Sequence, residues 1–261
     1  MQGDWPLVGR VEEFRFLEAA LFGPDSLGAV IAGQAGVGKS RLARELLRKA
    51  HNCDFTRHWA VGTESARSVP LGAIAGWCAN ASSNPNTFAQ QLVERFAHSG
   101  TPVVIGVDDA HLIDDFSAFV LHQLVLRGAA KALITIRSGE PTPDAVTALW
   151  KEAHLQRLDL QALSKNESDE LLTAALHGPV DDNSALRMWR LTQGNALYTY
   201  HLVTQELREG RLRRLSGCWH WFDNPVISDS LADLIEQQIG SLSESVRLVV
   251  DTVAVAEPSR V

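Results

Sequence analysis

The sequence predicts an α/β protein, with a parallel sheet covered by helices and a small helical domain after it. Short apolar runs alternate with helical patterns as far as Leu160. Strands that alternate with helices are typical of a parallel sheet with both faces covered. A glycine-rich stretch joins one of these runs to a helical pattern. Beyond Leu160 the helical patterns follow one another directly, which indicates a separate helical domain.

Apolar runs of strand length are the candidate strands. They are Ala29–Ala32, Phe55–Val61, Pro102–Val107, Ala132–Ile136 and Leu155–Leu160. Between them, apolar residues recur at helical spacing, and these stretches predict the covering helices. The predicted helices are Ser40–His51, Leu71–Ala79, Thr87–His98, Asp115–Leu126 and Thr142–Trp150.

The helical domain opens with a clear start signal. Ser164 and Glu167 have the spacing of a capping box, in which the serine caps the helix and the glutamate reaches back to it. Three helical patterns follow, at Lys165–Leu176, Asn183–Leu191 and Ala196–Arg208. We therefore expect a small helical bundle directly after the sheet.

The last part of the chain predicts a hairpin and a further module. Leu212–Phe222 holds two apolar stretches around Ser216-Gly217, typical of a hairpin, with Trp219 and Trp221 on one face as core residues. From Ser230 two helical patterns run to Glu257 without elements to cover them. We expect three domains: 1–162, the α/β domain; 163–224, the helical domain with its hairpin; and 225–261, the start of a module that continues in a longer protein.

The glycine-rich stretch is the strongest functional signal. It spells G-x-x-x-x-G-K-[ST], the P-loop that holds a nucleoside triphosphate in P-loop NTPases. Its residues are Gly33, Gln34, Ala35, Gly36, Val37, Gly38, Lys39 and Ser40. Backbone N–H groups of the tight turn and the following helix N-terminus attract phosphate. Lys39 adds a charge for the β- and γ-phosphates, and the Ser40 hydroxyl can bind Mg²⁺.

A second motif follows the predicted strand Pro102–Val107. Asp108 and Asp109 come at its end, the Walker B arrangement. Asp108 is expected to hold the Mg²⁺ that Ser40 also contacts. Asp109 is expected to orient or deprotonate the attacking water. For His111 two interpretations stay open: a hydrogen bond that shapes the loop, or a sensor of the γ-phosphate.

Arg137 ends the predicted strand beside the Walker B strand. Ligands of open α/β sheets bind at the carboxyl edge, where this guanidinium is expected to contact the γ-phosphate. The alternative is a surface arginine at a strand end. Thr135, two residues earlier, is expected to face the interior of the sheet.

Composition excludes several classes. The chain has 261 residues, 45% of them hydrophobic, and a net charge of −7. An acidic chain is a poor candidate for tight non-specific nucleic-acid binding. The three cysteines have no metal-ligand spacing and are read as reduced thiols of a cytoplasmic protein. No stretch approaches the roughly 18 uncharged apolar residues of a membrane span, and the N-terminus lacks the pattern of a signal peptide.

Together these motifs resemble those of STAND-class NTPases, relatives of AAA+ proteins. More narrowly, the chain resembles the ATPase module of large ATP-binding LuxR-type transcriptional regulators. The resemblance rests on Leu7-Val8-Gly9-Arg10 with Glu12-Glu13, the P-loop, Asp108-Asp109-Ala110-His111, Thr135-x-Arg137 and Gly194-Asn195. In addition, Leu231–Glu257 resembles the opening of the family's winged-helix-like region.

The resemblance implies a slowly hydrolysing ATP switch, closed with ADP and open and self-associating with ATP. It places Val8, Gly9 and Arg10 on the adenine and ribose side and makes the helical domain a lid. Gly194-Asn195-Ala196 matches the lid's Gly-x-Pro motif without its proline, and His201 stands where an acidic residue is frequent. The predicted nucleotide-binding residues are Val8, Gly9, Arg10, Gly33 to Arg41 and Asn195.

Two other functions stay open. The chain could hold ATP or ADP structurally without turnover, or it could be an AAA+ remodelling or DNA-loading ATPase. The latter needs basic DNA-facing elements. The only basic cluster of note, read as a solvated helix end, is Arg208, Arg211, Arg213 and Arg214. We therefore expect nucleotide as the partner, and neither direct DNA binding nor a membrane.

Overall fold

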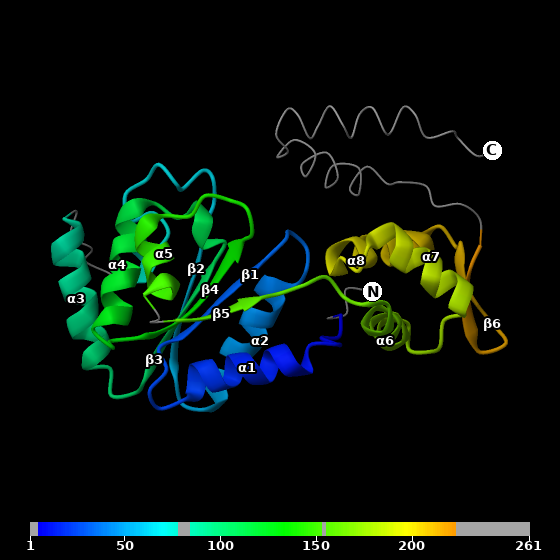
Figure 1. Cartoon of the computed structure of the whole chain (residues 1–261), viewed down its shortest axis with the longest axis horizontal. Helices are drawn as coiled ribbons and strands as arrows, with labels where there is room; N and C mark the ends of the chain where they lie inside the picture. Colours follow the sequence, from blue (N-terminus) through cyan, green and yellow to red (C-terminus); the bar gives the residue numbers. More distant parts are fainter. Residues whose placement is uncertain (1–4, 78–83, 153–154, 223–261) are drawn as a thin grey trace.

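A parallel five-stranded sheet forms the first half of the protein, seen here in a computed structural model that describes residues 5–77, 84–152 and 155–222 (Figure 1). The strand order is β2-β3-β4-β1-β5, so β2, β3 and β4 are neighbours in chain order, whereas the chain passes over β4 and β3 between β1 and β2 and over β1 between β4 and β5. All five predicted strands are present and parallel. Their bounds are Gly28–Gly33 (β1), Thr56–Val61 (β2), Val103–Asp108 (β3), Lys131–Arg137 (β4) and Gln156–Asp159 (β5).

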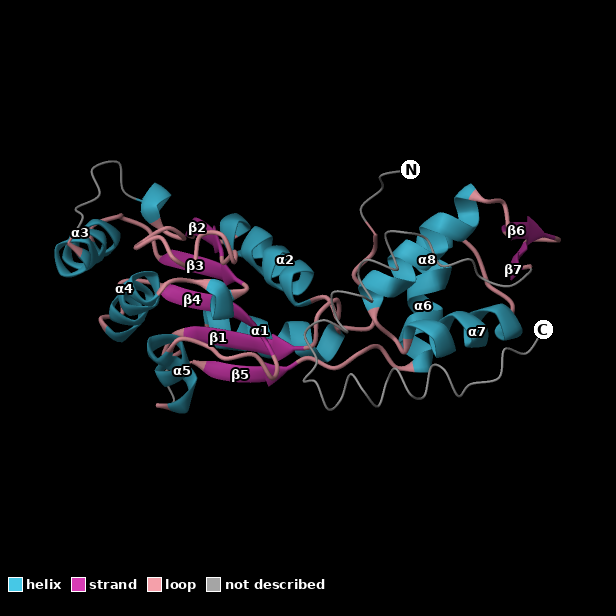
Figure 2. Ribbon diagram, turned by 90° about the horizontal axis from the view of Figure 1, so that it is seen from above, coloured by secondary structure: helices cyan, strands magenta, loops and turns pink. Residues whose placement is uncertain are grey.

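Helices cover both faces of this sheet (Figure 2). One face carries α1 (Val11–Phe22) and α2 (Lys39–Asn52), and the other carries α3 (Pro85–Ala97), α4 (Asp115–Leu126) and α5 (Asp144–Lys151). Successive residues of a strand point to opposite faces, so each strand contributes to both layers. In β1, Ala29 and Ile31 pack toward α1 and α2, whereas Val30 and Ala32 pack toward the other layer. The fold is that of P-loop NTPases.

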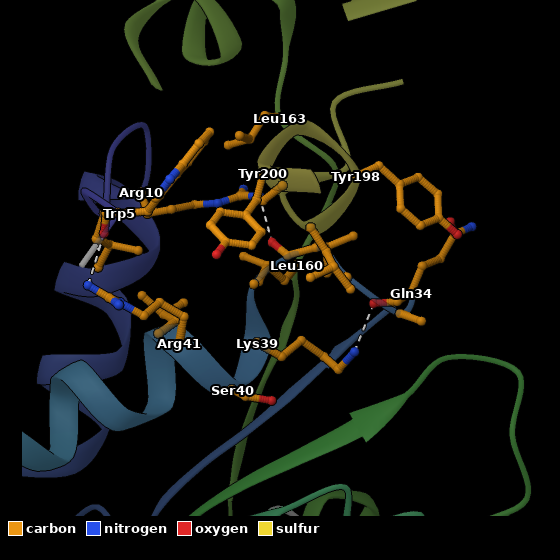
Figure 3. Close-up of a pocket in the computed structure, with 18 of the residues that line it drawn as sticks. Trp5, Arg10, Gln34, Lys39, Ser40, Arg41, Leu160, Leu163, Tyr198 and Tyr200 are labelled. Carbon is orange, nitrogen blue, oxygen red and sulfur yellow. Dashed lines mark hydrogen bonds between the residues drawn. The ribbon is translucent and has the colours of Figure 1, made fainter. Parts of the chain in front are cut away.

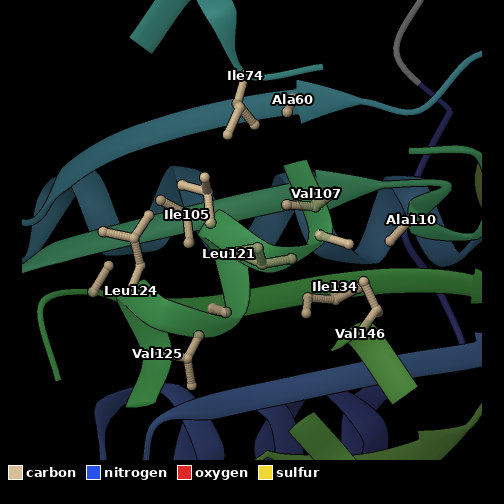
Figure 4. Close-up of a cluster of buried hydrophobic side chains, with 14 of the residues drawn as sticks. Ala60, Ile74, Ile105, Val107, Ala110, Leu121, Leu124, Val125, Ile134 and Val146 are labelled. Atoms are coloured by element: carbon tan, nitrogen blue, oxygen red, sulfur yellow. The ribbon is translucent and has the colours of Figure 1, made fainter. Parts of the chain in front are cut away.

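The larger core lies between the sheet and α3, α4 and α5 (Figure 4). Ile105 and Ile134 from the sheet meet Leu121 and Leu124 of α4, all nearly inaccessible to solvent. This apolar packing fixes the positions of β3 and β4, whose carboxyl ends carry the Walker B and Arg137 side chains.

Two helices differ from prediction. The predicted helix at Leu71–Ala79 is wrong within the described residues: the segment forms turns and a short 3₁₀ helix, η1 (Ala75–Trp77). Gly72 and Gly76 each disfavour a helix by about 1 kcal/mol. Leu71 adopts a φ of 60°, outside the right-handed helical region, and its N–H donates to Asp114 Oδ1. Conversely, α1 was not predicted, although its buried Leu17, Ala20 and Leu21 have helical spacing.

The helical segment follows β5, beyond the carboxyl edge of the sheet (Figure 1). It consists of α6 (Lys165–Leu176), α7 (Asp182–Thr192) and α8 (Ala196–Arg208), then the hairpin strands β6 (Leu212–Leu215) and β7 (Cys218–Trp221). The predicted capping box of Ser164 and Glu167 is present at α6. Trp221 is buried among these helices and Trp219 is partly buried against the same core, as predicted.

A buried carboxylate ties the hairpin to α8. Glu206 accepts hydrogen bonds from Arg211 Nε and Nη2 at 2.7 and 2.8 Å and from Trp221 Nε1 at 2.7 Å. Burial acts to raise the pKa of Glu206, but the hydrogen bonds from Arg211 and Trp221 outweigh it and the pKa is lowered. The predicted module at 225–261 lies outside the described residues. Among the helices described, none has the length and apolarity needed to span a bilayer.

Candidate nucleotide-binding site

The P-loop joins β1 to α2, as the sequence predicts. Gly36 and Gly38 have φ values of 79° and 104°, a region that glycine adopts without steric cost. Gly38 is the N-cap of α2, so the first N–H groups of the helix have no intrahelical acceptor. A loop of this shape before a helix N-terminus can bind a phosphate group.

Lys39 lies buried at the floor of a cavity of about 840 Å³. Its Nζ donates to the carbonyl oxygen of Gly33 at 2.9 Å and to that of Gln34 at 2.8 Å. The bond to Gln34 is drawn in Figure 3. Burial lowers the pKa of Lys39 and Arg137 adds to this, while Asp109 and Asp108 oppose it. The ammonium group is held at the loop, where phosphate oxygens can replace the two carbonyls as acceptors.

Asp108 ends β3 and is buried. Its Oδ1 accepts hydrogen bonds from Ser40 Oγ and from Thr135 Oγ1, both at 2.7 Å. Its Oδ2 lies 3.5 Å from Nη2 of Arg44, which also stands over the Trp59 ring. Ser40 and Asp108 therefore bring two hard oxygen donors together, the donor type that Mg²⁺ prefers. No cluster of three or more metal-binding side chains occurs in the described ranges, and Mg²⁺ in such sites relies on one or two carboxylates plus phosphate.

Thr135 performs a role that the sequence reasoning missed. It is fully buried, as expected, but its hydroxyl donates to Asp108 and accepts from the backbone N–H of Asp109 at 2.9 Å. One hydroxyl in β4 thus fixes both residues of the Walker B pair. In the sequence, the feature that could have shown this role is the position of Thr135, two residues before Arg137 on the strand beside the Walker B strand.

Asp109 turns away from Asp108 at the strand end. Its backbone has a φ of 50°, and its side chain lines the cavity. Burial raises the pKa of Asp109, the charge of Asp108 raises it further, and Arg137 and Lys39 oppose both. A carboxylate with a raised pKa beside a phosphate-binding loop can accept a proton from water.

His111 is buried behind Asp109. Its Nδ1 lies 4.0 Å from Asp109 Oδ1 and has no hydrogen-bond partner among the described residues. Burial and the charge of Arg137 lower its pKa to about 4, so the ring is neutral at pH 7. The sequence left two roles open for His111, a hydrogen bond that shapes the loop or a sensor of the γ-phosphate. Its Nδ1 forms no hydrogen bond with a loop carbonyl in the part of the chain that the structure describes.

Arg137 ends β4 directly beside Gly33 of β1 and lines the cavity. This is the predicted position at the carboxyl edge of the sheet. Its guanidinium is near enough to Lys39, Asp109 and His111 to shift their pKa values. The same group can contribute positive charge to a phosphate bound at the loop.

The stretch Val8-Gly9-Arg10 borders the cavity, but the side chain of Arg10 mainly holds neighbouring segments of the protein together. Its guanidinium donates to the carbonyl oxygens of Gln161 at 2.6 Å and Val37 at 3.5 Å and pairs with Glu13 at 2.8 Å. Gly9, with a φ of 70°, packs so closely on Glu167 that an added Cβ would lie 2.7 Å from the Cβ of Glu167. Val8 and Arg10 line the cavity.

An aromatic wall was also missed. Trp5 and Tyr200 meet edge to face with ring centroids 5.2 Å apart, and Tyr198 lines the cavity from the same helix. Figure 3 shows Trp5 and Tyr200 above Lys39 and Ser40, which lie toward the sheet. Arg41, predicted to bind nucleotide, donates from Nη2 to the Trp5 carbonyl at 3.0 Å. Aromatic faces of this kind can stack on a base.

Asn195 does not line the cavity, unlike most of the predicted binding residues. Its Nδ2 donates to the Ala35 carbonyl of the P-loop at 2.9 Å, and its Oδ1 caps α8. Gly9, Gly33 and Asp108 also lie behind the lining. The predicted residues on the cavity wall are Val8, Arg10, Gln34, Ala35, Gly36, Val37, Gly38, Lys39, Ser40, Arg41, Asp109 and Arg137.

Comparison with known proteins agrees with this geometry. The sequence profile of the AAA ATPase domain matches residues 6–136, half of the chain. The chain belongs to the AAA ATPase domain family. The matched region of this AAA ATPase domain includes the P-loop, the Walker B pair and β4 almost to its end. No curated protein matches the sequence.

Several solved structures share the fold. The Orc1 protein of Aeropyrum pernix, solved in complex with DNA, is similar over 98% of this chain and 74% of its own, with 17% identity and a TM-score of 0.59. Cdc6p from Pyrobaculum aerophilum is similar over 81% of this chain and 66% of its own, at 16% identity and a TM-score of 0.58. The RuvB branch migration motor of Thermotoga maritima covers 77% of this chain, at 14% identity and a TM-score of 0.51. This chain spans only 62% of that RuvB chain.

Proposed function

We propose that this AAA ATPase domain is a nucleotide-gated signalling switch that binds ATP or ADP with Mg²⁺ and hydrolyses ATP slowly. The observation that carries the proposal is that the α/β domain and the helical segment both contribute residues to the wall of one cavity. The P-loop and Arg137 line one side, and Ala196, Leu197, Tyr198 and Tyr200 of α8 line the other. A nucleotide bound between two structural units can change how they sit together.

The chemistry follows from the side chains already described. Lys39 and the P-loop N–H groups bind the β- and γ-phosphates. Ser40 and Asp108 would hold Mg²⁺, which when bound neutralises phosphate charge. Asp109 accepts a proton from the attacking water, and Arg137 supplies charge to the γ-phosphate. Val8, Trp5 and Tyr200 border the end of the cavity that suits the base.

Slow turnover is supported by the way the other cavity arginines are used. Arg10 and Arg41 donate to backbone carbonyls, and Arg44 pairs with Asp108. An arginine that adds charge to the transition state, beside Lys39, must therefore be Arg137 or come from another molecule. This matches a switch of the STAND class, as in LuxR-type regulators. Residues 1–162 and 163–224 would be the two moving domains, and 225–261 the start of the next.

The test has two parts. Protein purified without added nucleotide is denatured, and the released nucleotide is identified by chromatography; we expect ADP. The same protein is then examined by sedimentation with MgADP and with a non-hydrolysable ATP analogue. A larger species with the analogue supports the switch. Identical behaviour in both states, with either nucleotide bound, would leave a structural nucleotide-binding module.

The fold shared with a DNA-bound Orc1 favours a second candidate, a DNA-associated ATPase. Charge argues against it. The net charge is −7, and in the basic cluster Arg211 is neutralised by its ion pair with the buried Glu206. A gel shift at physiological salt decides: a sequence-specific complex would favour the DNA-associated function, and no shift would favour the switch.

A further inference from the structure

Asn195 connects the P-loop to α8 through both ends of its side-chain amide. Oδ1 accepts from the N–H groups of Leu197 at 3.1 Å and Tyr198 at 3.3 Å, which caps the helix. Nδ2 donates to the Ala35 carbonyl at 2.9 Å. The residue is 8% exposed, and its partners fix the amide orientation because one end meets donors and the other an acceptor.

A second bond runs beside the first. The N–H of Leu197 also donates to the Gly36 carbonyl at 3.0 Å. The contact is so close that a Cβ on Gly36 would lie 2.4 Å from Asn195 Oδ1. Two consecutive carbonyls of the P-loop are therefore held by the first turn of α8.

Holding these carbonyls orients the phosphate-binding groups. In a trans peptide the C=O and the next N–H point in opposite directions. The Ala35 carbonyl faces Asn195, so the Gly36 N–H points the other way, and the Gly36 carbonyl sets the Val37 N–H in the same manner. Ala35, Gly36 and Val37 all line the cavity. These two bonds, from Asn195 to Ala35 and from Leu197 to Gly36, form a tether that directs the N–H donors of the loop at the site where phosphate binds.

The start of α8 is in turn fixed to the start of the helical segment. Gly194 has a φ of 72°, and its carbonyl accepts from the Leu163 N–H at 2.9 Å. Trp189 Nε1 donates to the Leu163 carbonyl at 3.3 Å. A shift of the P-loop peptides would therefore be passed to the residues that begin α6 and α8.

We infer that Asn195 is a positioning residue, which presents the P-loop N–H groups to phosphate and couples that loop to the helical segment. This rests on the proposed nucleotide site and deepens it. It also revises the predicted role of Asn195, from nucleotide contact to support of the loop.

The test removes the donor in two ways. Asn195→Asp keeps an oxygen that caps α8 but sets a carboxylate, with its added negative charge, against the Ala35 carbonyl. Asn195→Ser keeps a hydroxyl that caps α8 but is too short to reach Ala35, so it removes the same donor without adding charge. The matched control is Asn84→Asp, because Asn84 caps α3 by accepting from Asn86 and Thr87 N–H groups and does not line the cavity. Hydrogen exchange is measured without nucleotide and with ADP, and ADP affinity by calorimetry.

Without nucleotide, we expect Asn195→Asp to raise exchange in both 33–40 and 195–200, while Asn84→Asp matches the parent there. With ADP, the parent should gain protection in 33–40 and 163–200 together. Asn195→Asp should bind ADP about tenfold more weakly and lose the response in 163–200. Asn195→Ser should show the same losses, and weaker binding by Asn195→Asp alone would be an effect of its charge and would overturn the inference.

Exchange and affinity like those of Asn84→Asp would overturn the inference. So would weaker binding with the 163–200 response intact, since that is the behaviour of a simple nucleotide ligand. If the parent itself binds no ADP, the proposed nucleotide site fails, and the tether is still judged by the exchange measured without nucleotide.

Discussion

Asp108 and Asp109 are adjacent in the chain, but their carboxylates have different surroundings. Asp108 is buried between the hydroxyls of Ser40 and Thr135, with Arg44 beyond. Asp109 turns into the cavity with a left-handed backbone, beside Arg137 and in front of the neutral ring of His111. Two carboxylates in unlike settings suit two tasks, one holding a cation and one accepting a proton.

Asp109→Asn should separate these tasks. The amide cannot accept the proton of the attacking water, while Asp108 and Ser40 are unchanged. We expect Mg-ATP affinity to stay close to that of the parent and steady-state hydrolysis to slow by about 10²–10⁴-fold. The assay is phosphate release at saturating ATP. A variant that hydrolyses ATP at the parent rate would remove Asp109 from the mechanism.

His111 should make stability depend on pH. Its folded pKa of about 4 lies below the unfolded value of 6.5. Between these values the unfolded chain binds a proton that the folded chain does not, so stability falls as pH drops from 6.5 to 4. From pH 7 to 5, the parent should lose about 2 kcal/mol more than His111→Gln. Urea unfolding at both pH values measures this, and equal losses would show that His111 is not buried as a neutral ring.

At the scale of elements, the start of α8 is a junction fixed by several contacts. Gly194 meets Leu163, Asn195 caps the helix and contacts the P-loop, and Ala196 is the first helical residue. In the Gly-x-Pro lid motif that this stretch resembles, a proline occupies the position of Ala196. Proline suits the first position of a helix, because its missing N–H has no intrahelical acceptor to lose.

Ala196→Pro should therefore be tolerated and should slow ADP release. Asn195, with φ −72° and ψ 114°, already has the extended backbone that proline favours in the residue before it. We expect a stability gain of about 0.4–1 kcal/mol and a slower off-rate for a fluorescent ADP analogue in stopped flow. Unchanged or faster release from a folded variant would show that position 196 does not control closure over the nucleotide.

Gly194→Ala tests the same junction, because the added methyl group would fill the space between Gly194 and the Leu163 backbone. An added Cβ would lie 1.9 Å from the Leu163 carbonyl oxygen, in addition to the strain of a φ of 72°. Gly210→Ala is the control, since its φ is 67° but nothing lies within 4 Å of the new Cβ. The control should lose about 1–2 kcal/mol and Gly194→Ala clearly more in urea unfolding. Equal losses would mean that the Gly194–Leu163 contact is loose.

Over the whole molecule, local patterns predicted the sheet and most helices because hydrophobic spacing is read directly from sequence. All five strands were found, and α4, α6 and α8 have the predicted bounds. The Leu71–Ala79 helix failed because contacts distant in sequence shape this segment: Leu71 has a φ of 60°, and its N–H donates to Asp114. The same limit applies to the site. Local motifs identified Lys39 and the Asp108-Asp109 pair. Trp5, Thr135 and Tyr200 are far from these motifs in sequence and come next to them only in the folded chain, so no local pattern could identify their roles.

The central claim is that the P-loop cavity binds a nucleotide, and calorimetric titration of MgADP into parent and Lys39→Ala proteins tests it most directly. Lys131→Ala is the control: Lys131 Nζ also donates to two carbonyls, of Leu21 and Gly23, but it does not line the cavity. We expect parent and control to bind alike and Lys39→Ala to bind about a hundredfold more weakly or not at all. Equal affinity in all three folded proteins would place the nucleotide elsewhere, and an absence of binding in the parent would contradict the proposed function.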